Sequence, residues 1–311
     1  MIAARQAYRD HLVARMALDS RLACLDSDTG LFTGVDFGAD AARYLNLGIA
    51  EHTLIGVAAG MAAAGWTPFV TTMAAFAASR ALEAVKIDVA YNALPVRIAA
   101  THAGVAAGSL GPTHHELADL AVMRALPNMT VVVPGDAAAV PVLLDQLRAV
   151  PGPVYLRLGR GPTPPLPASA PAPELGRLQP LRGGRRAVLV ATGPLPVLAA
   201  LRAAELLAAA RVDAGVLQAH TLKPFDTATL LEWTADAELV VAVEEHWRTG
   251  GLGSAVAETL AENAPAPLLR VGWPDAFVAE VGGQEHLLDR AGVSGAAIAA
   301  AVSARLDGTE L

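Results

Sequence analysis

Short apolar runs alternate with longer segments of helical periodicity, and this alternation constrains the fold more than any other feature of the sequence. The run from Pro95 to Thr101 is almost wholly apolar, which is typical of a parallel strand covered on both faces. Strand–helix alternation of this kind favours an α/β fold with right-handed crossovers. Before residue 161 we predict strands over 21–25, 44–47, 67–72, 95–101, 129–133 and 154–158, and helices over 3–20, 49–64, 74–91, 116–125 and 136–149.

The alternation is interrupted once. Residues 161–184 hold seven prolines and few long apolar side chains, which predicts an interdomain linker that is extended rather than packed. The alternation then resumes, with strands predicted over 186–191, 213–218, 238–244 and 268–271, helices over 194–210, 226–235 and 252–263, and further helices at the end. We therefore expect two doubly wound domains, residues 1–160 and 185–311, with functional groups at the carboxyl ends of strands.

Charge and cysteine content exclude several classes of protein. Acidic residues outnumber basic ones by 30 to 23, so no nucleic-acid or anionic-lipid partner is expected. Residues 53–79 carry no charge, but they are rich in Ala, Gly and Thr and contain a turn signal at residues 65–68, which argues against a membrane span. The first residues have no signal-peptide pattern. The one cysteine, Cys24, permits no internal disulfide and fits a reducing, cytoplasmic location.

One carboxylate, Glu51, begins an otherwise uncharged segment. A carboxylate in such a neighbourhood would be partly buried, and its pKa would be raised. The alternative is a helix-terminal glutamate that is favoured only by the helix dipole. The spacing of the residues leaves both interpretations open.

Three histidines, His102, His114 and His115, fall within fourteen residues around a glycine-rich loop that follows the most apolar strand. At a strand end they could be metal ligands or proton carriers. His114 and His115 are adjacent, which suits a common metal site poorly. The alternative is that they are loop histidines that cap a helix.

Two further patterns are weaker. The glycine-rich segment 250–254 opens a helix after a strand, as a phosphate loop would, but it has no Walker lysine and does not fit G-x-G-x-x-G. Tight packing between strand and helix is the favoured explanation. Phe76 and Arg80 are four residues apart, on one predicted helical face, where core packing is the usual explanation for the phenylalanine.

Taken together, a series of short motifs resembles the C-terminal half of transketolase, the pyrimidine-binding domain followed by the transketolase C-terminal domain. The Gly-Pro-Thr-His element separates transketolases and deoxyxylulose-phosphate synthases from the β subunits of 2-oxoacid dehydrogenases. The matching motifs, in the family's order over nearly the whole chain, are Gly48–His52, Thr72–Phe76 with Arg80, Leu94–Val96, Thr101–His102, Gly111–His114, Pro127–Met129, Pro134–Asp136, Lys223–Asp226, Glu244–Glu245 and Gly250–Gly253.

The resemblance implies thiamine diphosphate as the cofactor. Glu51 matches the carboxylate that hydrogen-bonds the aminopyrimidine ring, so that the exocyclic nitrogen can take the C2 proton. Phe76 matches an aromatic ring packed on the pyrimidine, Met73 replaces a second one, and Arg80 is expected in the same cofactor pocket. His114 matches a histidine that exchanges protons with the substrate carbonyl.

The resemblance also implies a substrate site. Arg5, Ser27, His102 and Arg160 fall where the family grips a sugar phosphate, for which several convergent donors are needed. Leu110 stands where the family has an acid that binds a substrate hydroxyl. We therefore expect ordinary ketol donors but an acceptor that is deoxygenated or more apolar next to its aldehyde carbon.

The Gly-Asp-Gly motif with which the family holds Mg²⁺ and the diphosphate does not occur in the 311 residues. The resemblance therefore implies the C-terminal (β) subunit of a split transketolase, with no metal ligands of its own. An N-terminal (α) subunit would carry the diphosphate and Mg²⁺ in an α2β2 assembly. The expected reaction moves a two-carbon ketol unit from a ketose or ketose phosphate to an aldehyde. The alternatives are a deoxyxylulose-phosphate-synthase-like or 2-oxoacid-decarboxylating subunit, or a non-catalytic regulatory paralogue.

Overall fold

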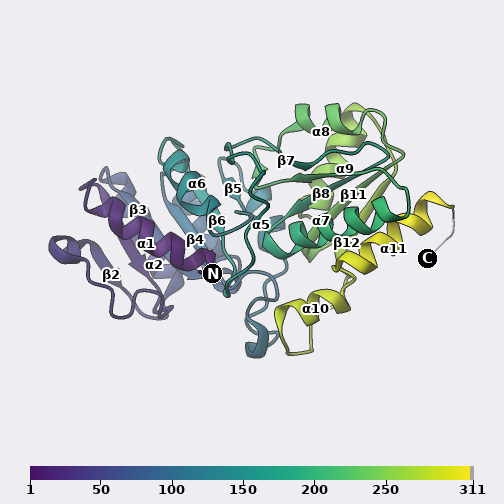
Figure 1. Ribbon diagram of the computed structural model, residues 1–311. Helices are drawn as coiled ribbons and strands as arrows, with labels where there is room; N and C mark the ends of the chain where they lie inside the picture. The colour runs from purple at the N-terminus through teal and green to yellow at the C-terminus, as the bar shows by residue number, and fades with distance from the viewer. Residues whose placement is uncertain (309–311) are drawn as a thin grey trace.

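The computed structural model, which describes residues 1–308, has two α/β units side by side (Figure 1). The strands of the first unit are β1 Leu22–Asp26, β2 Tyr44–Asn46, β3 Thr67–Met73, β4 Arg97–Thr101, β5 Thr130–Val132 and β6 Val154–Arg157. Its helices are α1 Ala4–Met16, α2 Glu51–Ala63, α3 Ala74–Ala77, α4 Leu82–Ala84, α5 Asp119–Ala125 and α6 Ala139–Leu147, with 3-10 turns at Gly38–Arg43 and Gly108–Leu110 and a π-helical stretch at Val85–Ala90.

The second unit has the same α/β architecture, with a smaller sheet. Its strands are β7 Gln179–Arg182, β8 Ala187–Thr192, β9 Ala214–Gln218, β10 Thr221–Lys223, β11 Leu239–Trp247 and β12 Leu268–Trp273. Its helices are α7 Pro194–Ala209, α8 Thr227–Thr234, α9 Leu252–Asn263, α10 Gln284–Arg290 and α11 Gly295–Leu306. The predicted α/β class with two doubly wound units is confirmed.

Alternation of side chains along the strands divides the core of the first unit into two layers. Cys24, Phe69 and Ala99 face α1 and α6, whereas Val70 and Ile98 face α2, α4 and α5. The sheet has the order β10-β5-β6-β4-β3-β1-β2 and is parallel except for β10. Because its strands are covered on both faces, the near-continuous apolar runs of the sequence are explained.

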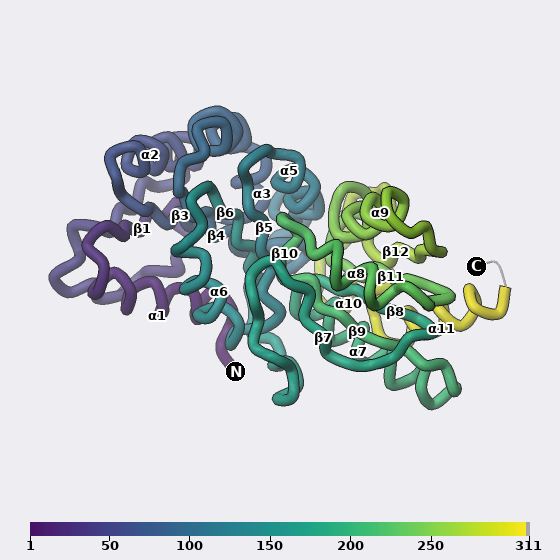
Figure 2. Tube along the Cα trace, turned by 90° about the horizontal axis from the view of Figure 1, so that it is seen from above, coloured from purple at the N-terminus to yellow at the C-terminus, as the bar shows by residue number. Residues whose placement is uncertain are grey.

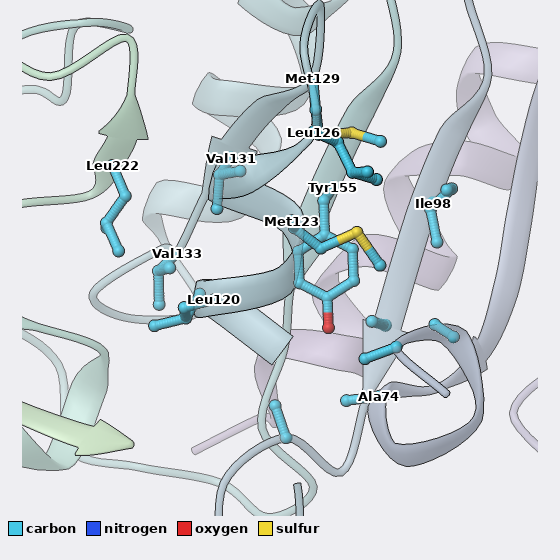
Figure 3. Close-up of a cluster of buried hydrophobic side chains, with 14 of the residues drawn as sticks. Ala74, Ile98, Leu120, Met123, Leu126, Met129, Val131, Val133, Tyr155 and Leu222 are labelled. Carbon is cyan, nitrogen blue, oxygen red and sulfur yellow. The ribbon is translucent and has the colours of Figure 1, made fainter. Parts of the chain in front are cut away.

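The two units share structure. Strand β10 follows β9 of the second unit but pairs antiparallel with β5 of the first, while the second sheet has the order β12-β11-β8-β9-β7. Leu222 of β10 belongs to the same buried cluster as Tyr155 and Met129 of the first unit (Figure 3). The sequence analysis did not predict β10, which begins only three residues after β9 ends. The tube view places β10 and β5 together at the junction (Figure 2).

Two predictions about local structure were wrong. The proline-rich segment is irregular at first but ends in β7, which pairs antiparallel with β9, and the adjacent Leu178 is 4% exposed. The prediction that the whole of 161–184 is unpacked is thus corrected, because its last apolar residues complete the edge of the second sheet. The single helix predicted over 74–91 is broken after α3, and the Ser79 hydroxyl, just beyond the end of α3, donates to the Ala75 carbonyl.

One stretch of the described residues, 284–306, is long and apolar enough to cross a membrane by length and composition alone. The structure divides this stretch into α10, with 7 residues, and α11, with 12. Each is shorter than the roughly 20 residues that a membrane-spanning helix needs. Helix α11 packs instead against α7, with Ile298 and Val302 buried between them.

Candidate functional site

The residues singled out in the sequence gather at one edge of the first sheet. The carboxyl ends of its parallel strands meet there, which is where α/β proteins bind ligands. Ser27 follows β1, Glu51 follows β2, Met73 ends β3, His102 follows β4 and Arg160 follows β6. Five segments that are distant in the sequence thus contribute to a single site.

At one end of this edge, which we call the Glu51 end, four side chains contact one another. The Glu51 carboxylate is 1% exposed at the start of α2, and its Oε2 accepts a hydrogen bond of 3.0 Å from Nη1 of Arg80. The Arg80 guanidinium carbon lies 4.8 Å from the centre of the Phe76 ring. The edge of the His114 imidazole contacts the same ring, with 5.5 Å between centroids. Glu51 is therefore buried as expected, but with a cation as its partner.

His114 is oriented by its neighbour in the sequence. Its Nδ1 lies 2.8 Å from the hydroxyl of Thr113, which in turn makes a long hydrogen bond, 3.5 Å, to the Leu110 carbonyl. In the tautomer in which Nδ1–H donates to that hydroxyl, Nε2 carries the lone pair. Within residues 1–308, Nε2 has no hydrogen-bond partner, so it is free to exchange a proton with a ligand.

At the opposite end, the basic end, two arginines surround a buried histidine. Nε of Arg5 donates to the Arg160 carbonyl at 2.8 Å, and Nη1 of Arg160 donates to the Ala107 carbonyl at 3.2 Å. His102, 4% exposed, has its pKa lowered to about 4 by burial and then by the charges of Arg5, Arg160 and His114. Carbonyls, not carboxylates, hold the guanidiniums, so their charge remains available to an anion.

The other candidates are placed less directly. The Ser27 hydroxyl is buried and donates to Thr72 at 2.9 Å, so that only its lone pairs remain for a ligand. Met73 is partly exposed at the start of α3, one turn before Phe76. Leu110 is 41% exposed in the loop that leads to His114.

The structure also addresses whether the three histidines are arranged as metal ligands. No group of three His, Cys, Asp or Glu side chains suited to a metal ion is found among residues 1–308. His115 is turned away from its neighbour, and its Nε2 donates to the Gly108 carbonyl at 3.2 Å. The interpretation of His102 and His114 as groups that handle protons or ligands fits this arrangement better.

The glycine-rich segment 250–253 is not an anion site. The Glu244 carboxylate accepts from the backbone N–H of Leu252 and Gly253 at 2.7 and 2.8 Å, which are the groups a phosphate would need. A Cβ on Gly251 would lie 2.0 Å from Glu244, and one on Gly250 would lie 2.3 Å from Ala121. The prediction that these glycines allow close packing is confirmed.

A buried polar network beneath the site was not predicted. Arg157 forms an ion pair with Asp119 (2.7 Å) and donates to the Glu245 carbonyl (3.0 Å), so it ties the first unit to the second. The Glu245 carboxylate accepts from the N–H of Val105 at 2.7 Å, and burial raises its pKa to about 7. The one sequence signal was a lone arginine in the apolar run 154–158, which indicates a buried charge that needs a partner.

Comparison with known proteins gives a consistent result. Residues 1–165 match the transketolase pyrimidine-binding domain, and residues 176–298 match the transketolase C-terminal domain. The chain is 39% identical over 292 residues to the 6-deoxy-6-sulfo-D-fructose transketolase subunit SqwH of Clostridium sp. (strain MSTE9), covering 93% of this chain and 90% of that protein. It is 37% identical over 289 residues to an apulose-4-phosphate transketolase subunit of Phocaeicola vulgatus, covering 92% and 91%.

Comparison with a solved structure agrees with these sequence matches. A split-gene transketolase, described as an inactive β4 tetramer, superimposes with a TM-score of 0.87 and 40% sequence identity. The match covers 97% of both chains.

Proposed function

This chain belongs to the transketolase family, and we propose that within the family it is the C-terminal (β) subunit of a two-component, thiamine-diphosphate-dependent transketolase. The observation that carries the proposal is the Glu51 end. There a buried carboxylate, an aromatic ring and a histidine with a free Nε2 lie within contact of one another. The subunits of split transketolases among its relatives support the same assignment.

The residues of the Glu51 end fit a flat, neutral heteroaromatic ring. Oε1 of Glu51 has no hydrogen-bond partner within residues 1–308, so the carboxyl group retains the capacity to bind a ring nitrogen. Phe76 and Met73 offer an aromatic face and a thioether, both of which suit a π-system. Thiamine diphosphate, when bound, supplies the carbon nucleophile of ketol transfer.

The described residues do not fit the remainder of that cofactor. Mg²⁺ prefers carboxylate and phosphate oxygens in near-octahedral geometry, and no suitable group of acidic side chains is found within residues 1–308. We therefore place Mg²⁺ and the diphosphate on a separate α subunit, with an α2β2 assembly as the proposed stoichiometry. In this proposal the active site forms between the two subunits.

The chain's own residues have distinct parts in the reaction. The basic end binds the anionic group of the donor through Arg5 and Arg160. The donor loses a two-carbon ketol unit and leaves as an aldehyde, and the acceptor carbonyl carbon gains the new carbon–carbon bond. The acceptor oxygen takes up the proton that the donor hydroxyl gives up, and Nε2 of His114 is placed to carry it.

Reconstitution tests this assignment. The purified chain should show no ketol transfer with hydroxypyruvate or fructose 6-phosphate as donor. Adding the subunit that co-purifies with it, together with Mg²⁺ and thiamine diphosphate, should restore turnover. Turnover by the chain alone would overturn the two-component proposal.

The donor separates the proposal from its alternatives. A deoxyxylulose-phosphate-synthase-like or 2-oxoacid-decarboxylating subunit would use pyruvate and release CO₂, whereas a transketolase would prefer ketose phosphates. A regulatory paralogue would assemble with the partner without any donor being consumed. Mass spectrometry of the complex identifies the partner in every case.

A further inference from the structure

A loop of the second unit packs against the loop that carries His114. Residues 274–283 connect β12 to α10, and they approach the glycines of the His114 loop closely. A Cβ on Gly111 would lie 3.0 Å from Cγ1 of Val281, and one on Gly108 would lie 3.1 Å from the Gly282 carbonyl. The two loops therefore form one wall, although they are more than 160 positions apart in the sequence.

Beside this wall lies a cavity of about 210 Å³ between the two units. A cavity of about 150 Å³ holds benzene, so there is room for a group of that size or slightly larger. Its inner surface is more apolar than polar. The residues that matter for its chemistry are Ala78, Pro112, His115, Glu116, Trp247 and Phe277.

The two aromatic side chains of the cavity are held in place but are not covered by other residues. The Trp247 and Phe277 rings are in edge-to-face contact, 5.8 Å between centroids, and the Trp247 indole N–H donates to the Ala276 carbonyl at 3.0 Å. Phe277 is nevertheless 84% exposed. An aromatic side chain held by its own loop and left uncovered is a ready contact for an apolar ligand group.

The polar groups of the cavity select against anions. None of its lining residues is a lysine or an arginine, and burial raises the pKa of Glu116 to about 7. His115 contributes its ring to the cavity wall, while its Nε2–H donates to the Gly108 carbonyl and its Nδ1 is buried.

The cavity adjoins the Glu51 end. Its wall includes Ser79, next to Arg80, and Pro112 and His115, which lie on either side of His114 in the sequence. Leu110 and Val281, 41% and 55% exposed, lie on the two loops that form this wall. An aldehyde whose carbonyl reaches His114 could extend its chain over apolar surface in this direction, away from the two arginines.

We propose that this cavity is an acceptor subsite that takes the far end of a neutral aldehyde, aliphatic or aromatic in its chain. The proposal rests on the proposed function, since it assigns the acceptor of that reaction. It agrees with the expectation of a more apolar acceptor drawn from Leu110, which lies on one of the two loops beside the cavity. Anionic donors would use the basic end, and apolar acceptors this cavity.

Binding without turnover gives the first test. Benzyl alcohol, which cannot react, is titrated into the isolated chain while tryptophan fluorescence is recorded. We expect a saturable change that is lost in Trp247→Phe and weakened about tenfold in Phe277→Ser. The matched control is Leu18→Ser, which removes another exposed apolar side chain, 77% exposed, and should leave binding unchanged. A signal that is unaltered in both Trp247→Phe and Phe277→Ser would overturn the proposal.

Kinetics of the reconstituted complex give the second test. Phenylacetaldehyde and its ring-hydroxylated form are compared with glycolaldehyde, which is too small to reach the cavity. Phe277→Ser should lower kcat/KM for the aromatic acceptors about tenfold and leave glycolaldehyde unchanged. Equal losses for all acceptors, or abolition of benzyl alcohol binding by the partner subunit, would make the cavity part of the subunit interface instead. Absence of turnover with glycolaldehyde as well would count against the proposed function, not against the cavity.

Discussion

The two ends of the site handle charge in opposite ways. At the Glu51 end, a buried carboxylate and a guanidinium compensate one another, and that guanidinium also covers the Phe76 ring. At the basic end, Arg5 and Arg160 hydrogen-bond backbone carbonyls, and neither forms an ion pair within residues 1–308. The first end is therefore suited to a neutral ring and the second to an anion, because only the second has net charge to offer.

The difference shows how one edge of a sheet can bind a neutral ring at one end and an anion at the other. An uncompensated positive charge near Glu51 would contribute little to the binding of a neutral heterocycle. A carboxylate near Arg5 would compete with an anionic substrate for the guanidinium. The pKa of His102, in the basic end, is lowered by the charges of the two arginines and also by that of His114. Substitutions at each end should therefore have different effects on the cofactor, the donor and stability.

The largest effect is expected for Glu51→Gln in the reconstituted complex. The amide keeps the shape of the side chain but removes the acid, so turnover should fall about 10²–10⁴-fold, as for a lost general acid–base step. Steady-state kinetics at saturating cofactor measures the loss, and gel filtration should show unchanged assembly. Wild-type turnover would mean that Glu51 serves only to begin helix α2.

A smaller and selective effect is expected for Arg160→Met. Loss of one charge-assisted hydrogen bond should raise KM for fructose 6-phosphate about 10–100-fold, because such bonds contribute about 1.5–3 kcal/mol. KM for the uncharged donor L-erythrulose should stay the same. Arg185→Met, at an exposed position of the second unit, is the matched control. Parallel increases for both donors would contradict an anion site at the basic end.

Next in size is the effect of Arg80→Met on the isolated chain. This substitution leaves the buried Glu51 carboxylate without its partner, while the half-exposed position of Arg80 limits the cost. We expect the free energy of unfolding to fall by about 1–2 kcal/mol, between the values for exposed and buried pairs. Urea denaturation of both single variants and of Glu51→Gln/Arg80→Met gives the coupling. Strict additivity would show that the pair contributes nothing.

The smallest effect concerns the pH dependence of His102. Its pKa of about 4 in the folded chain lies below the ordinary value of about 6.5. As the pH falls below that ordinary value, the unfolded chain binds a proton that the folded chain refuses, so stability decreases. Between pH 7 and pH 6 the loss should be about 0.7 kcal/mol. Comparison of wild type with His102→Gln by urea denaturation isolates it, and identical slopes would contradict a neutral, buried His102.

The Glu51 end was accessible from the sequence because its residues lie in short motifs. Glu51 stands alone in an uncharged segment, and Phe76 and Arg80 share a predicted helical face, but only the resemblance to the transketolase family placed them together in one cofactor pocket. The Glu51–Arg80 ion pair was not predicted, since it depends on the break in the helix after α3. A break of a few residues depends on tertiary packing, which average helix propensity does not register.

The sequence patterns did not predict the contacts at the junction between the units. Strand β10 and the network around Arg157 and Glu245 join segments about 90 positions apart. Periodicity describes only neighbours along the chain, so it can indicate that Arg157 is buried but not which groups surround it. For the same reason, the apolar residues within 274–283 did not indicate a binding surface until the structure placed them against the loop that carries His114.

Strand β10 has a consequence for how the molecule folds and can be divided. The boundary suggested by the proline-rich segment would cut a sheet, because the outermost strand of the first unit comes from the second half of the chain. Cut there, the first half would present the backbone of β5 as an unprotected edge, a template for aggregation. The two units are thus separate in architecture but interdependent in folding, and the chain is expected to unfold as one cooperative body.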